Sequence, residues 1–402
     1  MLGRLLLAVA IMWASAVSAQ SPVPPAQLDM AESGVAEGWF GASELSISLS
    51  RGVPFRVFTL DAPRRLVVDF QGLDDAAFAD AAFVQEDAAI AAARMGRFAT
   101  GWTRFIADLS GPYSTDDIAM QIDDKTGAAV LRLTLSPSDP EAFSAQAGTP
   151  PGARQVAAVP VPRTTQSDAG FVVVIDPGHG GVDPGAERDG VSEKQLMLAF
   201  AKQLAAELGQ MPDVQVYLTR EADVFVSLDA RVALAQAVHA DIFLSLHADA
   251  LSEGGAEGAT VYTLAEEASD AATAQLAARH NRADVIAGTD LTHTDDETTR
   301  VLLDLARRET EPRSRALAQA IVTVLDARDI PINRRPLRQA GFAVLKSADV
   351  PSVLVEVGFL SSARDLNNLS DPAWQKTMID ALTAALGHWR EIDERRTALL
   401  AR

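Results

Sequence analysis

The fold of this chain is decided by the stretch Phe171 to Gly181, which has the sequence FVVVIDPGHGG. Its five consecutive apolar residues are typical of a strand that is buried on both faces of a sheet. A glycine-rich turn that contains His179 follows the strand at once. Because open α/β sheets place their chemistry at the carboxyl ends of strands, His179 occupies a position typical of a functional residue.

Strands and helices alternate beyond this stretch. The sequence predicts strands at 171–175, 214–218, 242–246, 260–263 and 352–357, and helices at 194–208, 228–237, 313–325 and 374–389. This alternation is typical of an α/β domain with a mostly parallel sheet and helices on both faces. We expect that domain to span residues 170–392.

The first 19 residues have the features of a signal peptide. Arg4 precedes an apolar run from Leu5 to Trp13, and Val17-Ser18-Ala19 is similar to a small-residue cleavage site. The run is shorter than the stretch of about 20 apolar residues that a spanning helix needs. We therefore expect an exported and soluble mature chain without a transmembrane segment.

Two further segments are predicted before the α/β domain. In residues 38–136 short runs alternate apolar and polar side chains, for example at Leu45, Ile47 and Leu49, and turn signals separate the runs. This pattern is typical of a small antiparallel β domain. Residues 137–169 are rich in proline, alanine, serine and glutamine and have no periodicity, which predicts a flexible linker.

Composition and missing motifs exclude several classes of protein. The chain has 402 residues, no cysteine and a formal charge of −19. The charge opposes binding to nucleic acid, and the lack of cysteine excludes disulfides and thiolate metal sites. The glycine-rich turn lacks the spacing of the known phosphate-binding loops, and no G-x-S-x-G motif of a serine hydrolase occurs.

A metal site is indicated by residues near the predicted sheet edge. His179 and His247 both end predicted strands, and alternation lets His247 face a cleft while Leu246 packs in the core. Glu193 follows Ser192, which forms a predicted capping box with Gln195, so Glu193 alone could simply stabilise the helix dipole. Together, His179, Glu193 and His247 supply the three ligands of a catalytic zinc site with a fourth position open.

Glu356 is a lone carboxylate inside the apolar strand VLVEVGF. Burying an unpaired charge costs several kcal/mol or shifts the pKa, so this residue needs a partner or a purpose. One interpretation is a general base beside the metal. The alternative is a salt bridge to Arg334, Arg335 or Arg338.

Two aspartates remain ambiguous. Asp176 precedes Pro177 in the first loop, and Asp249 lies two residues after His247. Either carboxylate could orient a ligand histidine through the other ring nitrogen, which is the usual arrangement around metals. Either could equally be a simple turn residue.

About 50 residues, 264–312, separate a predicted strand from the next regular helix, which is long for a connection in a compact domain. The first part has an alanine-rich helical pattern over 271–282, and the second opens with a capping box from Thr294 to Glu297. The insertion is either a surface helical hairpin or a lid over the site.

From residue 171 to 390 the chain resembles the zinc-dependent N-acetylmuramoyl-L-alanine amidases of bacterial cell-wall turnover. The resemblance is carried by five blocks in order: VIDPGHGG (174–181), SEK (192–194), SLHAD (245–249), QAGFAVL (339–345) and VLVEVGF (353–359). It implies zinc ligands at His179, Glu193 and His247 and a catalytic glutamate at Glu356. It also implies hydrolysis of the amide between N-acetylmuramic acid and the L-alanine of the stem peptide, for wall turnover and daughter-cell separation.

Residues 38–136 resemble the AMIN domain that precedes such enzymes, mainly in strand pattern, which implies a peptidoglycan partner and a periplasmic location. The inserted segment resembles the regulatory helix of the periplasmic cell-division amidases, which implies a LytM-type activator protein. We expect residues 264–312 to hold the enzyme inactive, with an acidic side chain such as Glu266, Glu267 or Glu297 reaching the metal.

Two other functions remain open. A non-catalytic peptidoglycan-binding division scaffold would use the same fold as a surface, although the intact set His179, Glu193, His247 and Glu356 opposes this. A zinc peptidase that cuts within the stem peptide would use the same residues. Imidazole and carboxylate ligands also suit several divalent metals besides zinc.

Overall fold

The computed structural model describes residues 24–38, 41–78, 83, 89–99, 101–123, 125–150, 170–251, 256–286 and 297–400. The predicted signal peptide, residues 151–169 of the predicted linker, and Thr294 lie outside the described residues. Within the described part of the chain, no helix is both long enough and apolar enough to cross a membrane.

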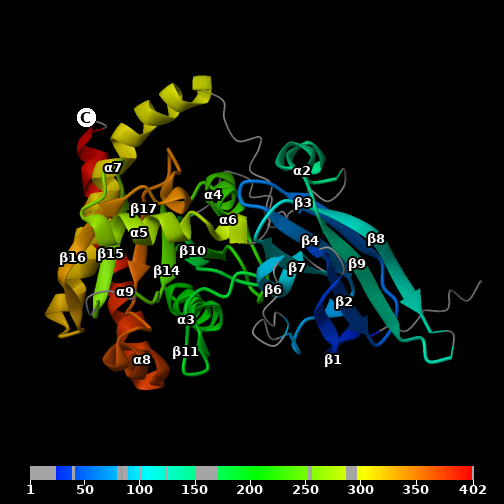
Figure 1. Ribbon diagram of the computed structural model, residues 1–402. Helices are drawn as coiled ribbons and strands as arrows, with labels where there is room; N and C mark the ends of the chain where they lie inside the picture. The colour runs from blue at the N-terminus through cyan, green and yellow to red at the C-terminus, as the bar shows by residue number, and fades with distance from the viewer. Residues whose placement is uncertain are drawn as a thin grey trace, which may run out of the picture.

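The first domain is a sandwich of two sheets (Figure 1). One sheet has the strand order β5-β1-β2-β9-β8 and the other has the order β3-β4-β7-β6. All pairings are antiparallel except a short parallel contact between β1 and β5. The strands are β1 (Ala26–Glu37), β2 (Ser43–Leu49), β3 (Phe55–Leu60), β4 (Arg65–Gln71), β5 (Leu73–Asp74), β6 (Ile90–Ala99), β7 (Trp102–Leu109), β8 (Tyr113–Ile122) and β9 (Ala129–Pro137).

Two elements of the β domain lie outside the predicted range 38–136. Strand β1 precedes it and pairs with β2 from Leu28 to Glu37, with a bulge between Asp29 and Gly34. Within the predicted linker, residues 140–146 form helix α2 (Pro140–Gln146), which Asp139 caps through the backbone N–H groups of Glu141 and Ala142. Phe143 anchors this helix in the core of the β domain with 3% exposure. One buried aromatic residue in a polar stretch leaves no periodic signal.

The second domain is built on a six-stranded sheet with the order β13-β10-β14-β17-β15-β16. The first four strands are parallel, and β15 runs antiparallel to β17 and parallel to β16. This confirms the predicted mostly parallel sheet. The strands are β10 (Phe171–Pro177), β13 (Val214–Leu218), β14 (Ile242–His247), β15 (Ala259–Leu264), β16 (Ile332–Ala340) and β17 (Ser352–Glu356), with a small hairpin of β11 (Glu187–Arg188) and β12 (Val191–Ser192).

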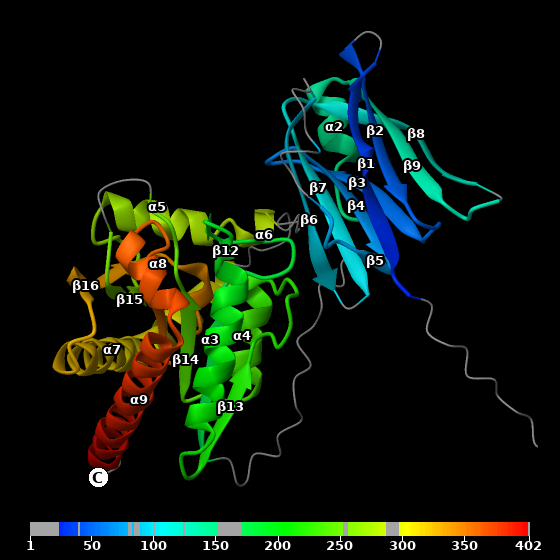
Figure 2. The same cartoon turned by 90° about the horizontal axis from the view of Figure 1, so that it is seen from below.

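Helices cover both faces of this sheet (Figure 2). Val173, Ile175 and Leu244 point to the face that carries α3 (Glu193–Leu208), α7 (Glu297–Ala327) and α9 (Pro372–Leu400). Val174 and Phe243 point to the face that carries α4 (Leu228–Ala237) and α5 (Ala271–His280). The remaining short elements are α6 (Ala283–Ile286), η2 (Ala343–Leu345) and α8 (Ala363–Ser370).

Two helices are longer than the sequence predicts. Helix α7 begins at Glu297 and continues through Pro312, so the second half of the insertion and the predicted helix 313–325 are one element. A proline removes one helical hydrogen bond, and residues such as Leu317 and Ile321 still bury the helix against the sheet. Helix α9 continues to Leu400, beyond the predicted domain end at 392.

The β domain packs against the loop that carries His179. The backbone N–H of Phe225 donates to the carbonyl of Arg97 on β6 at 3.1 Å. The rings of Phe98 and Phe225 stack with centroids 6.0 Å apart, and they are buried with Ile106 and Val182. A Cβ atom on Gly181 would lie 1.9 Å from the Arg97 carbonyl oxygen, so this contact requires glycine.

Candidate metal and catalytic site

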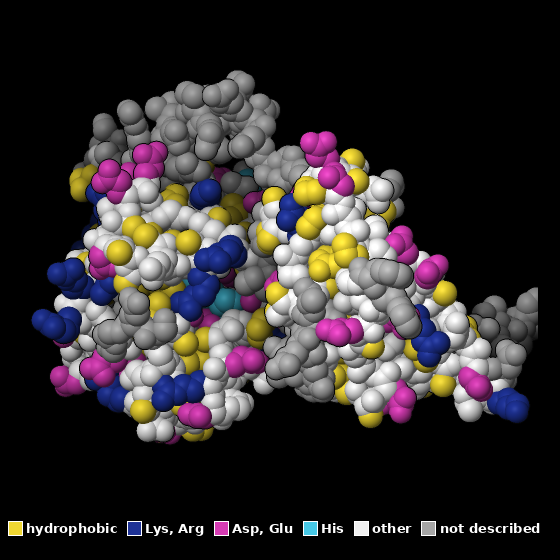
Figure 3. Space-filling view, viewed as in Figure 1, with side chains coloured by type: hydrophobic (Ala, Val, Ile, Leu, Met, Phe, Trp, Pro, Cys, Tyr) yellow, Lys and Arg dark blue, Asp and Glu magenta, His cyan; other side chains and the backbone are white. Residues whose placement is uncertain are grey.

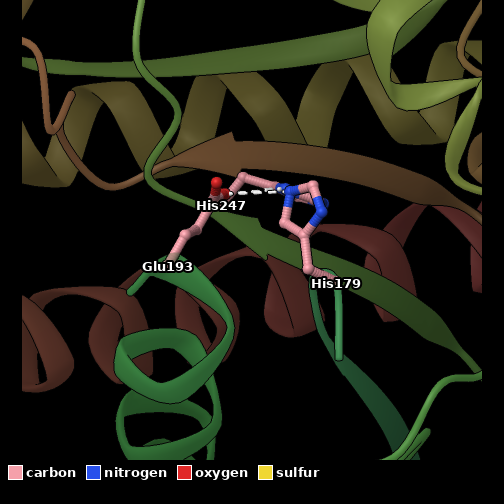
Figure 4. A group of neighbouring side chains, drawn as sticks. All are labelled: His179, Glu193 and His247. Carbon is pink, nitrogen blue, oxygen red and sulfur yellow. Dashed lines mark hydrogen bonds and ion pairs between the residues drawn. The ribbon is translucent and has the colours of Figure 1, made fainter. Parts of the chain in front are cut away.

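The three predicted ligands come together at the carboxyl edge of the sheet (Figure 4). His179 lies in the loop after β10, Glu193 is the first residue of α3, and His247 is the last residue of β14. One donor atom from each side chain lies within 4.8 Å of the other two. Three segments far apart in the sequence thus form one cluster of nitrogen and oxygen donors.

The glycine-rich loop lets these side chains approach closely. A Cβ atom on Gly178 would lie 2.2 Å from the Cε1 atom of His247, and one on Gly185 would lie 2.7 Å from Glu193 Oε2. His179 itself has a φ angle of 59°, which is uncommon for a residue with a side chain. The backbone conformation at His179 is therefore held by its surroundings.

The carboxylate of Glu193 is fixed on both oxygens. Its Oε1 accepts from the backbone N–H of Ala248 at 2.9 Å, and its Oε2 accepts from that of Ala186 at 2.8 Å. Oε1 also lies 3.1 Å from His247 Nδ1 and 3.3 Å from His179 Nε2. The predicted capping box does not form, because Ser192 makes no side-chain bond to the helix.

A carboxylate that the sequence analysis missed orients His179. Asp183 Oδ2 lies 2.9 Å from His179 Nδ1, and the side chain is buried. Asp176 does not take this role, because its carboxylate accepts from Arg231, Thr219 and Ser245 instead. The spacing of Asp183, four residues after the histidine in the same glycine-rich loop, was the available signal.

The electrostatics of the cluster favour a positive charge beside Glu193. Burial by itself lowers the pKa of His179, but the carboxylates of Asp183 and Glu193 outweigh burial and raise this pKa well above its ordinary value. Burial and the neighbouring His280 lower the pKa of His247 to about 4. The imidazole is therefore uncharged at neutral pH, which is the form that binds a metal ion. Burial raises the pKa of Glu193, but His179 and His247 outweigh it and hold this pKa well below its ordinary value.

The donor set fits a divalent cation such as zinc. His179 Nε2 is buried, and among the described atoms no hydrogen-bond partner meets it, although Glu193 Oε1 lies 3.3 Å away outside bonding geometry. Two imidazoles and one carboxylate are the ligand types of catalytic zinc sites. A cation bound by these three residues would supply the positive charge that the carboxylates of Asp183 and Glu193 favour at this place.

Glu356 lies beside this cluster, at the end of β17 and opposite His247 in the parallel pairing. Its Oε2 accepts from the backbone N–H of Asp249 at 2.9 Å, and its buried Oε1 has no hydrogen-bond partner among the described atoms. Burial, then the carboxylates of Asp249 and Glu193, raise the pKa of Glu356 well above its ordinary value. The alternative salt bridge is not formed, because Arg338 pairs with Asp270 and none of the three arginines pairs with Glu356 in the described structure.

His280, at the end of α5, is a second residue that the sequence analysis missed. Its Nε2 lies 3.1 Å from Asp249 Oδ2 and 3.7 Å from Glu356 Oε1, and its ring centroid is 4.3 Å from that of His247. Asp249 thus contacts His280 rather than a predicted metal ligand. A lone histidine in a helical pattern gives no signal of this contact.

Comparisons with known proteins identify the family of each domain. A family model described as N-acetylmuramoyl-L-alanine amidase matches residues 173–388, and a model of the AMIN domain matches residues 39–136. The chain is 30% identical to the amidase AmiC of Neisseria meningitidis over 86% of each chain. It is 36% identical to the amidase AmiA of Escherichia coli over 57% of this chain and 80% of AmiA.

Among solved structures, the amidase AmiC2 of Nostoc punctiforme matches 55% of this chain and 97% of its own at 28% identity, with a TM-score of 0.40. The family model covers more than half of the chain, from the strand before His179 to the last helix. The chain therefore belongs to the N-acetylmuramoyl-L-alanine amidases and is an enzyme of that family, with an AMIN domain in front of its catalytic domain.

Proposed function

We propose that this protein hydrolyses the amide between N-acetylmuramic acid and the L-alanine of the peptidoglycan stem peptide, with zinc held by His179, Glu193 and His247 and with Glu356 as general base. The observation that carries the proposal is a pair of buried atoms without hydrogen-bond partners, His179 Nε2 and Glu356 Oε1. They belong to two donor groups that share His247. Family membership supports the choice of amide.

The residues around the cluster have distinct tasks. Zinc, when bound, would supply a Lewis acid that polarises the scissile carbonyl. The Asp183 carboxylate contacts Nδ1 of His179, which leaves Nε2 as the ring atom that would bind zinc. The two backbone bonds on Glu193 fix the direction of its carboxylate.

Glu356 is placed to move protons. The Asp249 N–H holds one oxygen, which leaves Oε1 free to take a proton from the attacking water and to deliver it to the leaving amine. A carboxylate with a raised pKa is a stronger base than an ordinary glutamate. The product peptide would then carry L-alanine at its amino terminus.

We also propose that the insertion 264–312 holds the site closed until an activator of the LytM type moves it. Glu266 and Glu267 are exposed, and the side chain of Glu297 lies outside the described structure. Among the described residues of the insertion, His280 contacts Glu356. The hollow between His179, His247 and His280 has a volume of only about 20 Å³, which is too small for a glycopeptide. Figure 3 shows histidine side chains at the bottom of the hollow between the two domains.

Polar contacts hold the end of α5 over the site. Arg279 pairs with Asp249 at 2.9 Å and donates to the Ala250 carbonyl at 2.8 Å. Asn281 donates to the Gly341 carbonyl at 2.8 Å and accepts from the Ala343 N–H at 2.7 Å. An activator protein would need to break only these few contacts at one end of the helix.

We also propose that the mature enzyme acts in the periplasm, in wall turnover and daughter-cell separation.

The test uses purified peptidoglycan sacculi and the full chain. Single substitutions at the end of α5 are preferable to deletion of the insertion, because Leu276 and Ala277 of α5 are part of the core. We expect His280→Ala to release stem peptides with an amino-terminal L-alanine at a higher rate than the unaltered chain, with loss on chelation and recovery with zinc. His388→Ala, on α9, is the matched control.

Mass spectrometry of the products separates the alternatives. Cleavage within the stem peptide would show a peptidase. No release from a folded, zinc-loaded His280→Ala variant supplied with an activator would favour a binding scaffold.

A further inference from the structure

An arginine cluster surrounds a cavity at the outer edge of the catalytic sheet. The cavity has a volume of about 440 Å³ and is lined by Arg334, Arg335 and Arg338 of β16, together with Tyr262, Leu251 and Phe359. Basic side chains gather on the face of the catalytic domain over the region of β16 (Figure 3). A local excess of positive charge is unusual in a chain with a net charge of −19. We call this cavity the arginine pocket.

The arginine pocket has unused positive charge. Its lining includes the carboxylate of Glu257, which pairs with Arg364 at 3.5 Å outside the cluster. Arg334 is exposed and makes no ion pair with any described residue. Arg335 only approaches Asp270, at 3.9 Å.

One arginine of the pocket wall, Arg338, already pairs with a carboxylate of the chain itself. Arg338 Nη1 lies 2.9 Å from Asp270 Oδ2 and also donates to Thr273 at 3.2 Å. Asp270 is the N-cap residue of α5, at the opposite end of this helix from His280. Two further guanidinium groups remain for a ligand.

The pocket lies within reach of the catalytic residues. Leu251 follows His247 by four residues and Phe359 follows Glu356 by three, so the loops after both catalytic strands form part of its wall. Helix α5 runs from Asp270 at the pocket to His280 at Glu356, and its ten residues correspond to about 15 Å at 1.5 Å each. An extended peptide covers this distance with roughly four or five residues at 3.3–3.6 Å each.

We propose that the arginine pocket binds the carboxylate groups at the distal end of the stem peptide while the amide to be cleaved lies at Glu356. This inference rests on the proposed function, and it adds a substrate subsite to it. The enzyme would then hold the stem peptide at two points. The amide next to the sugar would lie at Glu356, and the free carboxylates at the other end would lie in the arginine pocket. Two-point binding selects a peptide of the right length and charge.

The test measures peptide binding without catalysis. The probe is a synthetic four-residue peptide with an amino-terminal L-alanine and free carboxylates, which has no sugar amide to hydrolyse, and its copy with every carboxylate amidated. Because the unaltered site is proposed to be closed, calorimetric titration is done with the His280→Ala chain, alone and combined with either Arg334→Gln/Arg335→Gln or the charge-preserving pair Arg334→Lys/Arg335→Lys. Arg395→Gln is the matched control, because Arg395 is an exposed arginine on α9.

We expect the glutamine double variant to bind the free-carboxylate peptide roughly three- to tenfold more weakly, the effect of two exposed charge pairs. The lysine variant should recover most of this loss, and the amidated peptide should bind all variants equally weakly. The inference is wrong if the His280→Ala chain with its arginines intact binds both peptides equally or binds neither, or if the glutamine substitutions do not weaken binding.

Failure of the proposed function is a separate result. It would appear as the absence of peptides with amino-terminal L-alanine from sacculi, whatever the calorimetry shows. Charge-dependent peptide binding without such products would keep the arginine pocket and remove the amidase mechanism.

Discussion

Replacement of Asp183 tests whether the loop after β10 is built to hold a metal. Asp183 is 2% exposed and contacts His179 Nδ1 at 2.9 Å, and no described residue takes its place there. Removing a carboxylate that orients a ligand histidine typically lowers metal affinity 10- to 100-fold, or about 1.4–2.7 kcal/mol. The cost of leaving one buried N–H without a partner, about 1–3 kcal/mol, is of the same size.

Asp183→Asn keeps the volume and an acceptor oxygen, so it isolates the loss of charge, and we expect the lower end of the range, roughly tenfold. Asp183→Ala also removes the acceptor and should reach the upper end. The measurement is zinc affinity by competition with a fluorescent chelator at pH 8, with circular dichroism to confirm the fold. Asp189→Asn is the control, since its side chain is 72% exposed nearby. Zinc affinities within twofold of the unaltered chain for both Asp183 variants would refute this role.

Three further predictions follow from the structure. Glu356→Gln removes the proposed general base, so peptide release from sacculi should fall at least about 100-fold while zinc stays bound. The melting temperature should not fall, because burial and the carboxylates of Asp249 and Glu193 disfavour a charge on Glu356. Burial raises the pKa of Asp284 to about 6, so the folded state of the unaltered chain loses stability as pH rises from about 4 through 6. Asp284→Asn should therefore be more stable by up to about 3 kcal/mol at pH 7.5, and the difference in unfolding free energy should shrink at pH 5; a gap that is constant with pH would contradict this. Gly96→Ala puts a Cβ atom 2.4 Å from Val182 Cα and should separate the two domains, which small-angle X-ray scattering would detect as a larger radius of gyration, whereas Gly34→Ala, with 3.8 Å of clearance, should not change it.

The amino-acid sequence alone predicts the catalytic sheet and puts four candidate residues at one edge of it. The apolar run before His179 predicts a buried strand, and the same signal precedes His247 and surrounds Glu356. Parallel neighbours place their carboxyl ends together, and the pairing of His247 with Glu356 is the result. Glu193 could also be predicted, because the helix that follows the glycine-rich loop begins at the same edge of the sheet. The order of the two domains could also be predicted. The first part of the chain has only the periodicity of strands, whereas strand and helix patterns alternate after residue 170.

The side chains that contact these four residues could be identified only from the three-dimensional structure. Asp183 rather than Asp176 contacts His179, because the left-handed backbone at His179 turns the loop back on itself. His280 reaches Glu356, and Arg338 pairs with Asp270, through contacts between segments 76 and 68 residues apart. Phe143 fixes α2 by filling a gap in a core formed by other strands. Local periodicity records which face of an element is buried, whereas these partners depend on long-range packing, for which a single sequence carries no repeating signal.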